Sequence, residues 1–461
     1  MNKQVKIIFS NEDLVVKNDA LKNYVENNKG EFIPTLFNNE SVVIIKSPKQ
    51  DKQTLEDVRM LAGSISKSLV KNGVTIATLN DTALSEAFNS NESEDVLVAF
   101  VEGWNLGTYK YTTYKSEEKQ LHVELAFTNE ADVVNAKQKG GIRAAAMSFS
   151  RDLMNDTANE LNPETFPEVL KEEFKGSKVE VTVFDKADLE KMEMNGLLAV
   201  CRGSKYEPRF VELKYEGDSS KPLVALVGKG VTFDTGGISL KAGRDLSDMR
   251  MDMGGAAAVS GAIKLLAESN ADVNVIGLLQ IVENMPDNES ILPGDVIRYK
   301  NGKTVQVGNT DAEGRLILAD GLLRADELKA DFIVNIATLT GAAAVALGSK
   351  TGAVMGNLEY AQEMHILGAK NGDNVWPLPL IDAYESYLNS DYADFSNISS
   401  KGEAGAITAG LFLRRFVNDP KKWLHVDMAG VMESENTGYY AKSATGFGAR
   451  LLADYTIIKS K

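Results

Sequence analysis

Residues 222–237, PLVALVGKGVTFDTGG, are the stretch that decides the fold. The first half is an almost unbroken apolar run, and the second half is rich in glycine and carries Lys229 and Asp234. A strand that is buried on both faces has this pattern, and such strands are typical of parallel sheets covered by helices. The stretch therefore predicts a buried strand with a lysine and an aspartate at its carboxyl end.

Three further apolar runs have the same character, and two helix-like stretches lie among them. The runs are VNVIGLLQIVEN (273–284), DFIVNIATLTG (331–341) and WLHVDMAG (423–430), with helices expected at 253–269 and 313–329. Alternating strands and helices predict an α/β fold around a central, mainly parallel sheet. Because ligands of open α/β sheets bind beyond the carboxyl ends of the strands, we expect a functional site there.

The N-terminal part of the chain has a different residue pattern, with shorter apolar runs and no dense group of reactive side chains. SVVIIKS (41–47) and DVLVAFVEG (95–103) are predicted strands, and 54–73 is a predicted helix that ends at Gly73. We expect two α/β domains. The smaller N-terminal domain covers 1–140, a linking helix and turn covers 141–165, and the larger catalytic domain covers 166–461.

Composition limits the classes of function. The chain has 461 residues and a net charge of −15, which argues against a nucleic-acid or membrane partner. The single cysteine, Cys201, cannot form an intrachain disulfide, so a reducing, cytoplasmic location and a buried structural role are expected. With only three histidines in the chain, a metal site would have to rely on carboxylates. No signal peptide or membrane-spanning run is expected.

Three polar segments of the larger domain carry the candidate site. VGKGVTFDTGGISLK (227–241) and MRMDMGGAA (249–257) precede NTDAEGRL (309–316), and together they contain Lys229, Asp234, Lys241, Asp252, Asp311, Glu313 and Arg315. Taken singly, each has an ordinary explanation, such as a helix cap, a helix-dipole acid or an ion pair. GKGVTF lacks the third glycine of a dinucleotide loop and the ending of a P-loop, so nucleotide binding is not favoured.

Taken together, the segments favour a metal centre. Asp234, Asp252, Asp311 and Glu313 offer enough oxygen ligands for two divalent cations, as hydrolytic two-metal sites require. A buried lysine beside cations can lose its proton and bind metal through nitrogen. A network of ion pairs between these acids and the two lysines remains the alternative interpretation.

In this order, the three motifs resemble the leucyl (cytosol) aminopeptidase family, the M17-type di-zinc exopeptidases. The resemblance covers nearly all of residues 140–461 and extends to five further blocks, at 151–166, 283–307, 375–388, 393–417 and 423–432. In the N-terminal part, only EGWNLGTYKYTTYKS (102–116) shares more than general character with the family.

The resemblance implies a ligand set for two metal ions. One ion would be held by Lys229, Asp234, Asp252 and Glu313, and the other by Asp234, Glu313 and Asp311, including its backbone carbonyl. The ions would be Zn²⁺ or Mn²⁺, with Mg²⁺ and Co²⁺ as alternatives. They would activate a water as the nucleophile, and one of them would also bind the free α-amine of the substrate. Such a grip on the amine explains exopeptidase action.

The resemblance also implies catalytic and substrate-binding residues. Lys241 would stabilise the oxyanion, and Arg315 would hold a bicarbonate ion as the general base. A leucine-like or methionine-like side chain would enter an adaptable pocket formed by Met249, Asn309, Ala312, Thr338, Leu339, Gly341, Ala429 and Met432. The implied partners are peptides with a free N-terminus, and the implied assembly is a homohexamer.

Departures from the family pattern leave the predicted ligands intact. Thr235 stands where serine is common, and Leu292 stands where arginine is usual. Because neither change removes a predicted metal ligand or catalytic residue, we expect an active enzyme. Two other classes of function remain as alternatives. One is a DNA-binding regulator, against which the acidic composition argues, and the other is a di-metal hydrolase of phosphate esters.

Overall fold

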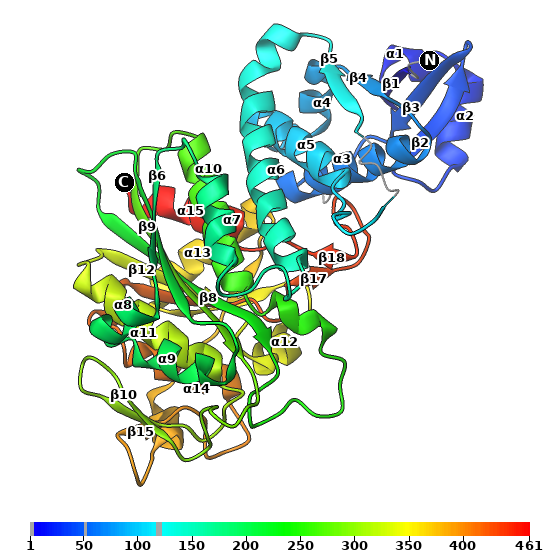
Figure 1. The fold of residues 1–461 in the computed structure, drawn as a ribbon. Helices are drawn as coiled ribbons and strands as arrows, with labels where there is room; N and C mark the ends of the chain where they lie inside the picture. Colours follow the sequence, from blue (N-terminus) through cyan, green and yellow to red (C-terminus); the bar gives the residue numbers. More distant parts are fainter. Residues whose placement is uncertain (1–3, 50–52, 117–121) are drawn as a thin grey trace. The chain divides into compact units, whose positions relative to one another are not determined.

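The computed structural model describes residues 4–49, 53–116 and 122–461 (Figure 1). Contacts divide the chain into two compact units. The first consists of Met1–Ser148 with Ser434–Ser443, and the second of Phe149–Glu433 with Ala444–Lys461. The division falls inside helix α6 (Val134–Asn155), within the segment expected to link the domains.

The first unit is built on a five-stranded sheet in the order β2-β3-β1-β4-β5. All neighbouring strands are parallel except β2 and β3, and the bounds are β1 (Gln4–Phe9), β2 (Phe32–Phe37), β3 (Glu40–Ile45), β4 (Ile76–Leu79) and β5 (Glu124–Phe127). The strand predicted at 41–47 and the helix predicted at 54–73 are confirmed as β3 and α3 (Leu55–Lys71). Thr54 and Asp57 form a capping box at the start of α3, which satisfies backbone N–H groups there.

The strand predicted for DVLVAFVEG is wrong, because these residues lie in helix α5 (Ser93–Gly107). Most of the helix is buried, with Val96, Ala99, Phe100 and Trp104 each at most 1% exposed. A helix buried on nearly all sides shows no polar face, and periodicity alone cannot separate it from a buried strand. Tertiary packing therefore decided the type of this element.

The second unit contains an eight-stranded sheet in the order β14-β13-β16-β12-β8-β9-β7-β6. Its four middle strands are mutually parallel, as predicted, while β13 and β7 run antiparallel to β16 and β9. The four apolar runs correspond to β8 (Leu223–Asp234), β9 (Asn274–Asn284), β12 (Phe332–Ala337) and β16 (Trp423–Asp427). The other strands are β6 (Val179–Phe184), β7 (Arg209–Glu216), β13 (Gly352–Gly356) and β14 (Val375–Pro377).

Helices α10 (Gly254–Glu268) and α11 (Glu313–Glu327) cover opposite faces of this sheet (Figure 1). On β8, a Cβ atom at Gly228 would meet Gly255 of α10, whereas the Lys229 side chain lies against Gly314 of α11. Successive strand residues point to opposite faces, so the two helices lie on different sides. Both helices begin close to the carboxyl edge of the sheet, where α11 starts with Glu313 and Asp252 precedes α10 by two residues.

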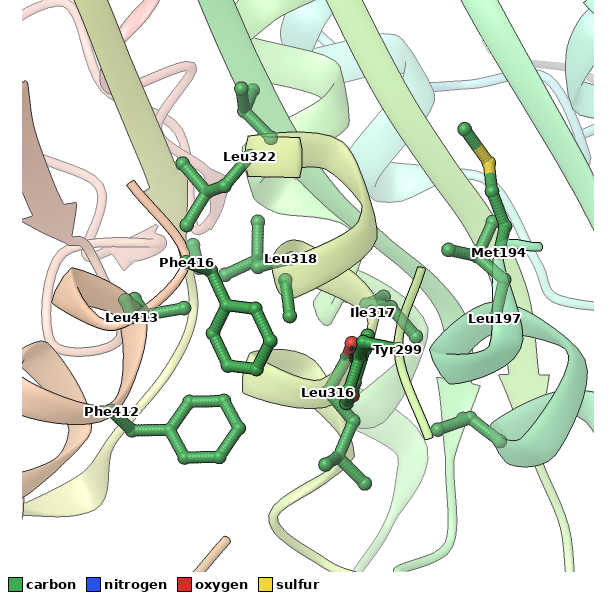
Figure 2. Close-up of a cluster of buried hydrophobic side chains, with 14 of the residues drawn as sticks. Met194, Leu197, Tyr299, Leu316, Ile317, Leu318, Leu322, Phe412, Leu413 and Phe416 are labelled. Atoms are coloured by element: carbon green, nitrogen blue, oxygen red, sulfur yellow. Dashed lines mark hydrogen bonds between the residues drawn. The ribbon is translucent and has the colours of Figure 1, made fainter. Parts of the chain in front are cut away.

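A core cluster holds α11 in place (Figure 2). Ile317, Leu318 and Leu322 are fully buried, and the hydroxyl of Tyr299 donates to the Leu316 carbonyl at 2.9 Å. Each such aliphatic side chain contributes about 1.5–3 kcal/mol when it is removed from water. The start of α11, which carries Glu313 and Arg315, is therefore attached to a rigid element.

Smaller elements complete the described chain. Besides short 3-10 helices, they are α1 (Asp13–Val16), α2 (Asp19–Asn27), α4 (Asp81–Ala87), α7 (Phe166–Glu173), α8 (Lys186–Met192), α9 (Asn195–Val200), α12 (Gly341–Leu347), α13 (Leu358–Asn371), α14 (Gly405–Arg414), α15 (Ala449–Lys459), β10 (Val296–Arg298), β11 (Thr304–Gln306), β15 (Phe395–Ser396), β17 (Glu433–Ser434) and β18 (Ser443–Ala444). Among the described residues, no helix combines the length and the apolar character that a membrane span requires.

Candidate metal centre

Polar residues mark the carboxyl ends of all four parallel strands. Asp234 ends β8, Asn284 ends β9 and Asp427 ends β16, while Thr338 directly follows β12. Parallel strands bring their carboxyl ends to one edge of the sheet, which is where ligands of α/β proteins bind. The predicted location of the functional site is thus also the place where these side chains meet.

Three buried carboxylates form a compact group at this edge. Ligand oxygens of Asp234, Asp252 and Glu313 all lie within 4.8 Å of one another. Glu313 is the first residue of α11, and Asp252 precedes α10 by two residues. Helix starts favour negative charge, and the strand end adds the third acid, so three separate elements converge on one point.

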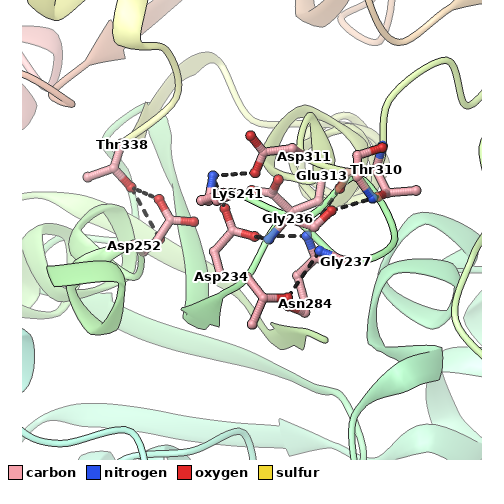
Figure 3. Close-up of polar contacts among 12 residues, drawn as sticks. Asp234, Gly236, Gly237, Lys241, Asp252, Asn284, Thr310, Asp311, Glu313 and Thr338 are labelled. Atoms are coloured by element: carbon pink, nitrogen blue, oxygen red, sulfur yellow. Dashed lines mark hydrogen bonds and ion pairs between the residues drawn. The ribbon is translucent and has the colours of Figure 1, made fainter. Parts of the chain in front are cut away.

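Two lysines form ion pairs with these acids, and Figure 3 shows the contacts of one of them, Lys241. The Lys229 Nζ lies 2.7 Å from Asp252 Oδ2 and 2.8 Å from Glu313 Oε1. The Lys241 Nζ lies 2.8 Å from Asp234 Oδ2 and also pairs with Asp311. The structure thus contains the ion pairs that the sequence allowed as an alternative. Six of the seven predicted metal-binding and catalytic residues take part in these two sets of ion pairs, and Arg315 is the seventh.

The charges in this network are not fully compensated. Burial raises the pKa of Asp234 to about 6, with the Glu313 charge adding to the rise, and burial raises the pKa of Asp252 far above its usual range. Burial alone would lower the pKa of Lys229, but Asp252 and Glu313 raise it above its ordinary value. Burial alone would raise the pKa of Glu313, but the charges of Lys229 and Lys241 lower it. Four carboxylates, those of Asp234, Asp252, Asp311 and Glu313, meet only these two ammonium groups in the ion pairs above, so the ionised acids outnumber the positive charges that pair with them.

The residues present fit a divalent cation. The Glu313 Oε2 is buried and accepts no hydrogen bond from any described residue. A buried carboxylate oxygen without a partner is costly, and a cation held by several oxygens removes that cost. The cluster, its missing positive charge and this oxygen all suit metal binding.

Two glycines of the motifs have specific structural reasons. A Cβ atom at Gly314 would lie 2.7 Å from Lys229 Cε, so a larger residue would displace the lysine from its present position beside Glu313. Gly237 has a φ of +62°, and a Cβ atom there would lie 2.7 Å from Asn284 Oδ1. These glycines keep space free for side chains of the site.

Arg315 is buried in the first turns of α11. Its Nη1 donates to the Asn397 carbonyl at 2.8 Å, and its Nε has no hydrogen-bond partner among the described residues. Burial lowers the pKa of Arg315 to about 10, which still leaves it charged at neutral pH. A charged guanidinium with a free N–H suits an oxyanion.

Several of the predicted pocket residues contact the cluster or its immediate neighbours. Asn309 Oδ1 accepts from the Asp311 N–H at 2.8 Å, and Thr338 Oγ1 donates to Asp252 Oδ1 at 2.7 Å. The backbone N–H groups of Leu339 and Ala429 both donate to Asp427, at 3.1 and 3.2 Å. Other polar contacts involve Ala312, whose carbonyl accepts from Asn397, and Met249, whose carbonyl accepts from Asp252.

The remaining two pocket residues lie further along the same loops. Gly341 is exposed and begins α12, and Met432 is half-buried with its carbonyl accepting from the Thr445 N–H at 3.0 Å. Their proposed contact with a substrate side chain stays a prediction.

Sequence reasoning missed three residues that organise this edge, Asn284, Thr310 and Asp427. Asp427 is 1% exposed, and its carboxylate also accepts from the Thr340 hydroxyl at 2.7 Å, so it orders the loop after β12. A usable signal was present, because Asp427 ends an apolar strand just as Asp234 does. Thr310 lies inside NTDAEGRL but carries no charge, which hid its role.

Fold and site together define an α/β protein with a buried carboxylate–lysine centre suited to divalent metal. Residues 148–453 match the cytosol aminopeptidase family, catalytic domain. The chain belongs to this family, as its motifs predicted, and is a metal-dependent aminopeptidase.

Similar proteins come from distant organisms. The chain is 38% identical over 425 residues to a probable cytosol aminopeptidase of Persephonella marina, covering 90% of this chain and 85% of the relative. It is 42% identical over 366 residues to the cytosol aminopeptidase of Homo sapiens, covering 78% and 70%. Among solved structures, the bottromycin maturation enzyme BotP in complex with Mn aligns over 100% of both chains, with a TM-score of 0.90 and 30% identity.

Proposed function

We propose that the chain hydrolyses the N-terminal residue from peptides with a free N-terminus, with a broad preference for leucine-like and methionine-like residues. The observation that carries the proposal is the buried cluster of Asp234, Asp252 and Glu313, together with the unpartnered Oε2 of Glu313. Peptide turnover is the corresponding role.

Two divalent ions belong to the proposed centre. Lys229, Asp234, Asp252 and Glu313 would hold one, and Asp234, Asp311 and Glu313 the other. When bound, the ions would lower the pKa of a water and polarise the scissile carbonyl. Zn²⁺ and Mn²⁺ are both candidates, with Mg²⁺ and Co²⁺ as alternatives, and the Mn complex of the structural neighbour BotP supports Mn²⁺ as the first ion to test.

Lys241 supplies a fixed positive charge. Burial alone would lower the pKa of its ammonium, but Asp234 and Glu313 raise it above the ordinary value, so the group stays protonated at neutral pH. A preorganised cation can stabilise the negative charge that develops on the scissile carbonyl oxygen. Lys241 is therefore assigned as the electrophile.

Arg315 is assigned as the residue that holds bicarbonate, which would accept the proton of the attacking water. The support is its buried, charged guanidinium with an unpartnered Nε. A planar oxyanion can accept two parallel hydrogen bonds from the N–H groups of an arginine. A lysine cannot offer two donors in this geometry.

The first substrate side chain would lie among mostly apolar residues of the loops around the centre. Methionine side chains adapt to different shapes, so Met249 and Met432 fit a broad preference. Assembly into a homohexamer is part of the proposal. It predicts a mass in solution six times the 50.1 kDa of one chain, which light scattering after gel filtration measures.

The reaction is tested with leucine p-nitroanilide. We expect hydrolysis with Mn²⁺ or Zn²⁺, no hydrolysis with excess chelator, and no hydrolysis of the N-acetylated substrate, because an acylated amine cannot bind metal. Equal cleavage of the acetylated substrate would contradict the amine-binding mechanism. Activity on p-nitrophenyl phosphate without activity on the amide would instead identify a phosphate-ester hydrolase, and a salt-sensitive DNA mobility shift would support the regulatory alternative.

A further inference from the structure

Asn284, the last residue of β9, contacts two of the segments that build the metal centre (Figure 3). Its Nδ2 donates to Asp234 Oδ1 at 2.8 Å and to the Thr310 carbonyl at 3.1 Å. The backbone carbonyl of Asn284 accepts hydrogen bonds from the backbone N–H and the hydroxyl of Thr235, at 3.1 and 2.8 Å. The side chain is 1% exposed, so these bonds form away from water.

The orientation of this amide follows from its partners. A backbone carbonyl only accepts hydrogen bonds, so the group that faces Thr310 must be the NH₂ group. The same NH₂ then faces Asp234, and the amide oxygen faces Gly237, which has no Cβ atom to obstruct it. Exchanging the oxygen and nitrogen would place two acceptors against each other at both contacts.

The contact with Asn284 restricts what the Asp234 carboxylate can bind. Its Oδ1 accepts from Asn284 and from the Gly236 N–H at 2.9 Å, which uses the acceptor capacity of that oxygen. Oδ2 receives neither of these hydrogen bonds and lies 2.8 Å from Lys241 Nζ. The amide therefore leaves Oδ2, and not Oδ1, as the Asp234 oxygen with acceptor capacity beyond its contact with Lys241.

Thr310 makes a second connection between the loop at 235–241 and the loop at 309–312. Its hydroxyl donates to the Gly236 carbonyl at 2.6 Å and accepts from the Ser239 N–H at 2.8 Å. Residues 235–241 lead to Lys241, and residues 309–312 include Asp311. Asn284 and Thr310 thus hold the two loops at a set separation, with the Asp234 carboxylate between them.

We propose that Asn284 is a positioning residue of the metal centre, whose amide NH₂ bridges the Asp234 carboxylate and the Thr310 carbonyl and so prepares the site for divalent metal. The inference rests on the proposed metal centre. Partners that orient a ligand commonly change metal affinity by about 10–100-fold when they are lost, without touching the metal themselves.

The test compares Mn²⁺ binding by the metal-stripped full-length protein and its variants, measured by titration calorimetry with electron paramagnetic resonance to count free Mn²⁺. Asn284→Asp keeps the shape but removes the donors, and Asn284→Ala removes the amide without adding charge. Asn274→Ala is the matched control, since Asn274 begins the same strand and donates to the Lys221 carbonyl at 3.3 Å. Thr310→Val tests the second connection and keeps the inference testable if a variant at 284 fails to fold.

We expect both Asn284 variants to bind Mn²⁺ about 10–100-fold more weakly than the wild type. The Mn²⁺ affinity of the Asn274→Ala control should stay within about two-fold of the wild type, because Asn274 contacts none of the proposed metal ligands in the described structure. Raised Mn²⁺ should restore much of the variants' rate, which a purely structural defect would not allow. Wild-type affinity in both folded Asn284 variants overturns the inference alone. A wild-type protein that binds no Mn²⁺ overturns the metal centre as well, whereas one that binds Mn²⁺ but cleaves no aminoacyl amide overturns only the proposed reaction.

Discussion

The ammonium of Lys229 lies 2.8 Å from Glu313 Oε1, with both side chains 3% exposed. This contact joins the middle of the central strand β8 to the first residue of α11. The other oxygen, Oε2, has no hydrogen-bond partner among the described residues. One oxygen of Glu313 is therefore paired with an ammonium group, and the other accepts no hydrogen bond. We therefore expect the proposed metal centre to depend strongly on Glu313.

Replacing Glu313 by alanine should remove a ligand shared by both proposed metal sites. We expect Mn²⁺ binding to fall and hydrolysis of leucine p-nitroanilide to drop by more than about 100-fold, since even indirect ligand partners cost about 10–100-fold. Glu327→Ala, at the far end of the same helix, is the control, because Glu327 pairs with Lys300 and Arg324 near the surface. A fully active Glu313 variant would refute the two-metal assignment.

Replacing Lys241 by methionine should slow the chemical step. The variant loses the cation that is assigned to stabilise the oxyanion, and removal of one such donor costs about 10²–10³-fold in kcat. Because Lys241 is not assigned as a metal ligand, metal content measured by elemental analysis should stay close to that of the wild type. An unchanged kcat would remove Lys241 from the mechanism.

Replacing Arg315 by methionine should abolish the response to bicarbonate. In buffer depleted of CO₂, we expect added bicarbonate to raise the rate of the wild type but not of the variant. Arg315→Lys should recover only part of the response, because an ammonium lacks the planar pair of N–H groups. A wild-type rate that is independent of bicarbonate would leave the general base to another group.

The buried carboxyl group of Glu283 should lower the free energy of unfolding as the pH rises and the group becomes ionised. Burial raises its pKa, and the hydrogen bond from Ser204 Oγ at 2.5 Å only partly offsets the rise. The folded state then binds the proton more tightly than the unfolded chain, so stability increases as the pH falls through the raised pKa and is lower at neutral pH. We expect Glu283→Gln to raise the melting temperature at pH 8 and to lose this advantage near pH 5.

The measurement is thermal unfolding from pH 5 to pH 8, with the exposed Glu216→Gln on β7 as the control. Glutamine keeps an acceptor for Ser204, so packing and hydrogen bonding change little. A shift in melting temperature that is the same at every pH would contradict the role of the buried charge.

Much of the catalytic unit was predictable from the sequence, because the relevant signals are local. Strands buried on both faces require continuous apolar runs, and all four runs proved to be the parallel strands β8, β9, β12 and β16. Functional side chains in such a sheet lie beyond the strand ends, so Asp234 and the start of α11 could be placed in one region before their contacts were known.

Elements that depend on their surroundings could not be predicted in this way. Residues 95–103 carry an apolar run that suits a strand, but burial against α3 makes them helical, with Glu102 Oε2 2.8 Å from Arg59 Nε inside the unit. Residues 434–443 belong to the first unit although they follow most of the second in the chain. Long-range packing decides both outcomes, and no local pattern records it.

By itself, the sequence determined the family, the α/β class and the residues available for metal, because motifs and apolar runs are properties of short segments. Only the tertiary structure decided how these residues face each other: which lysine pairs with which acid, which oxygen of Asp234 contacts Lys241 and which contacts Asn284, and that Asn284 and Asp427 order the loops. These contacts join segments that lie far apart in the chain. Their geometry exists only once the strands have aligned and the interior has excluded water, where each unpaired polar atom becomes costly.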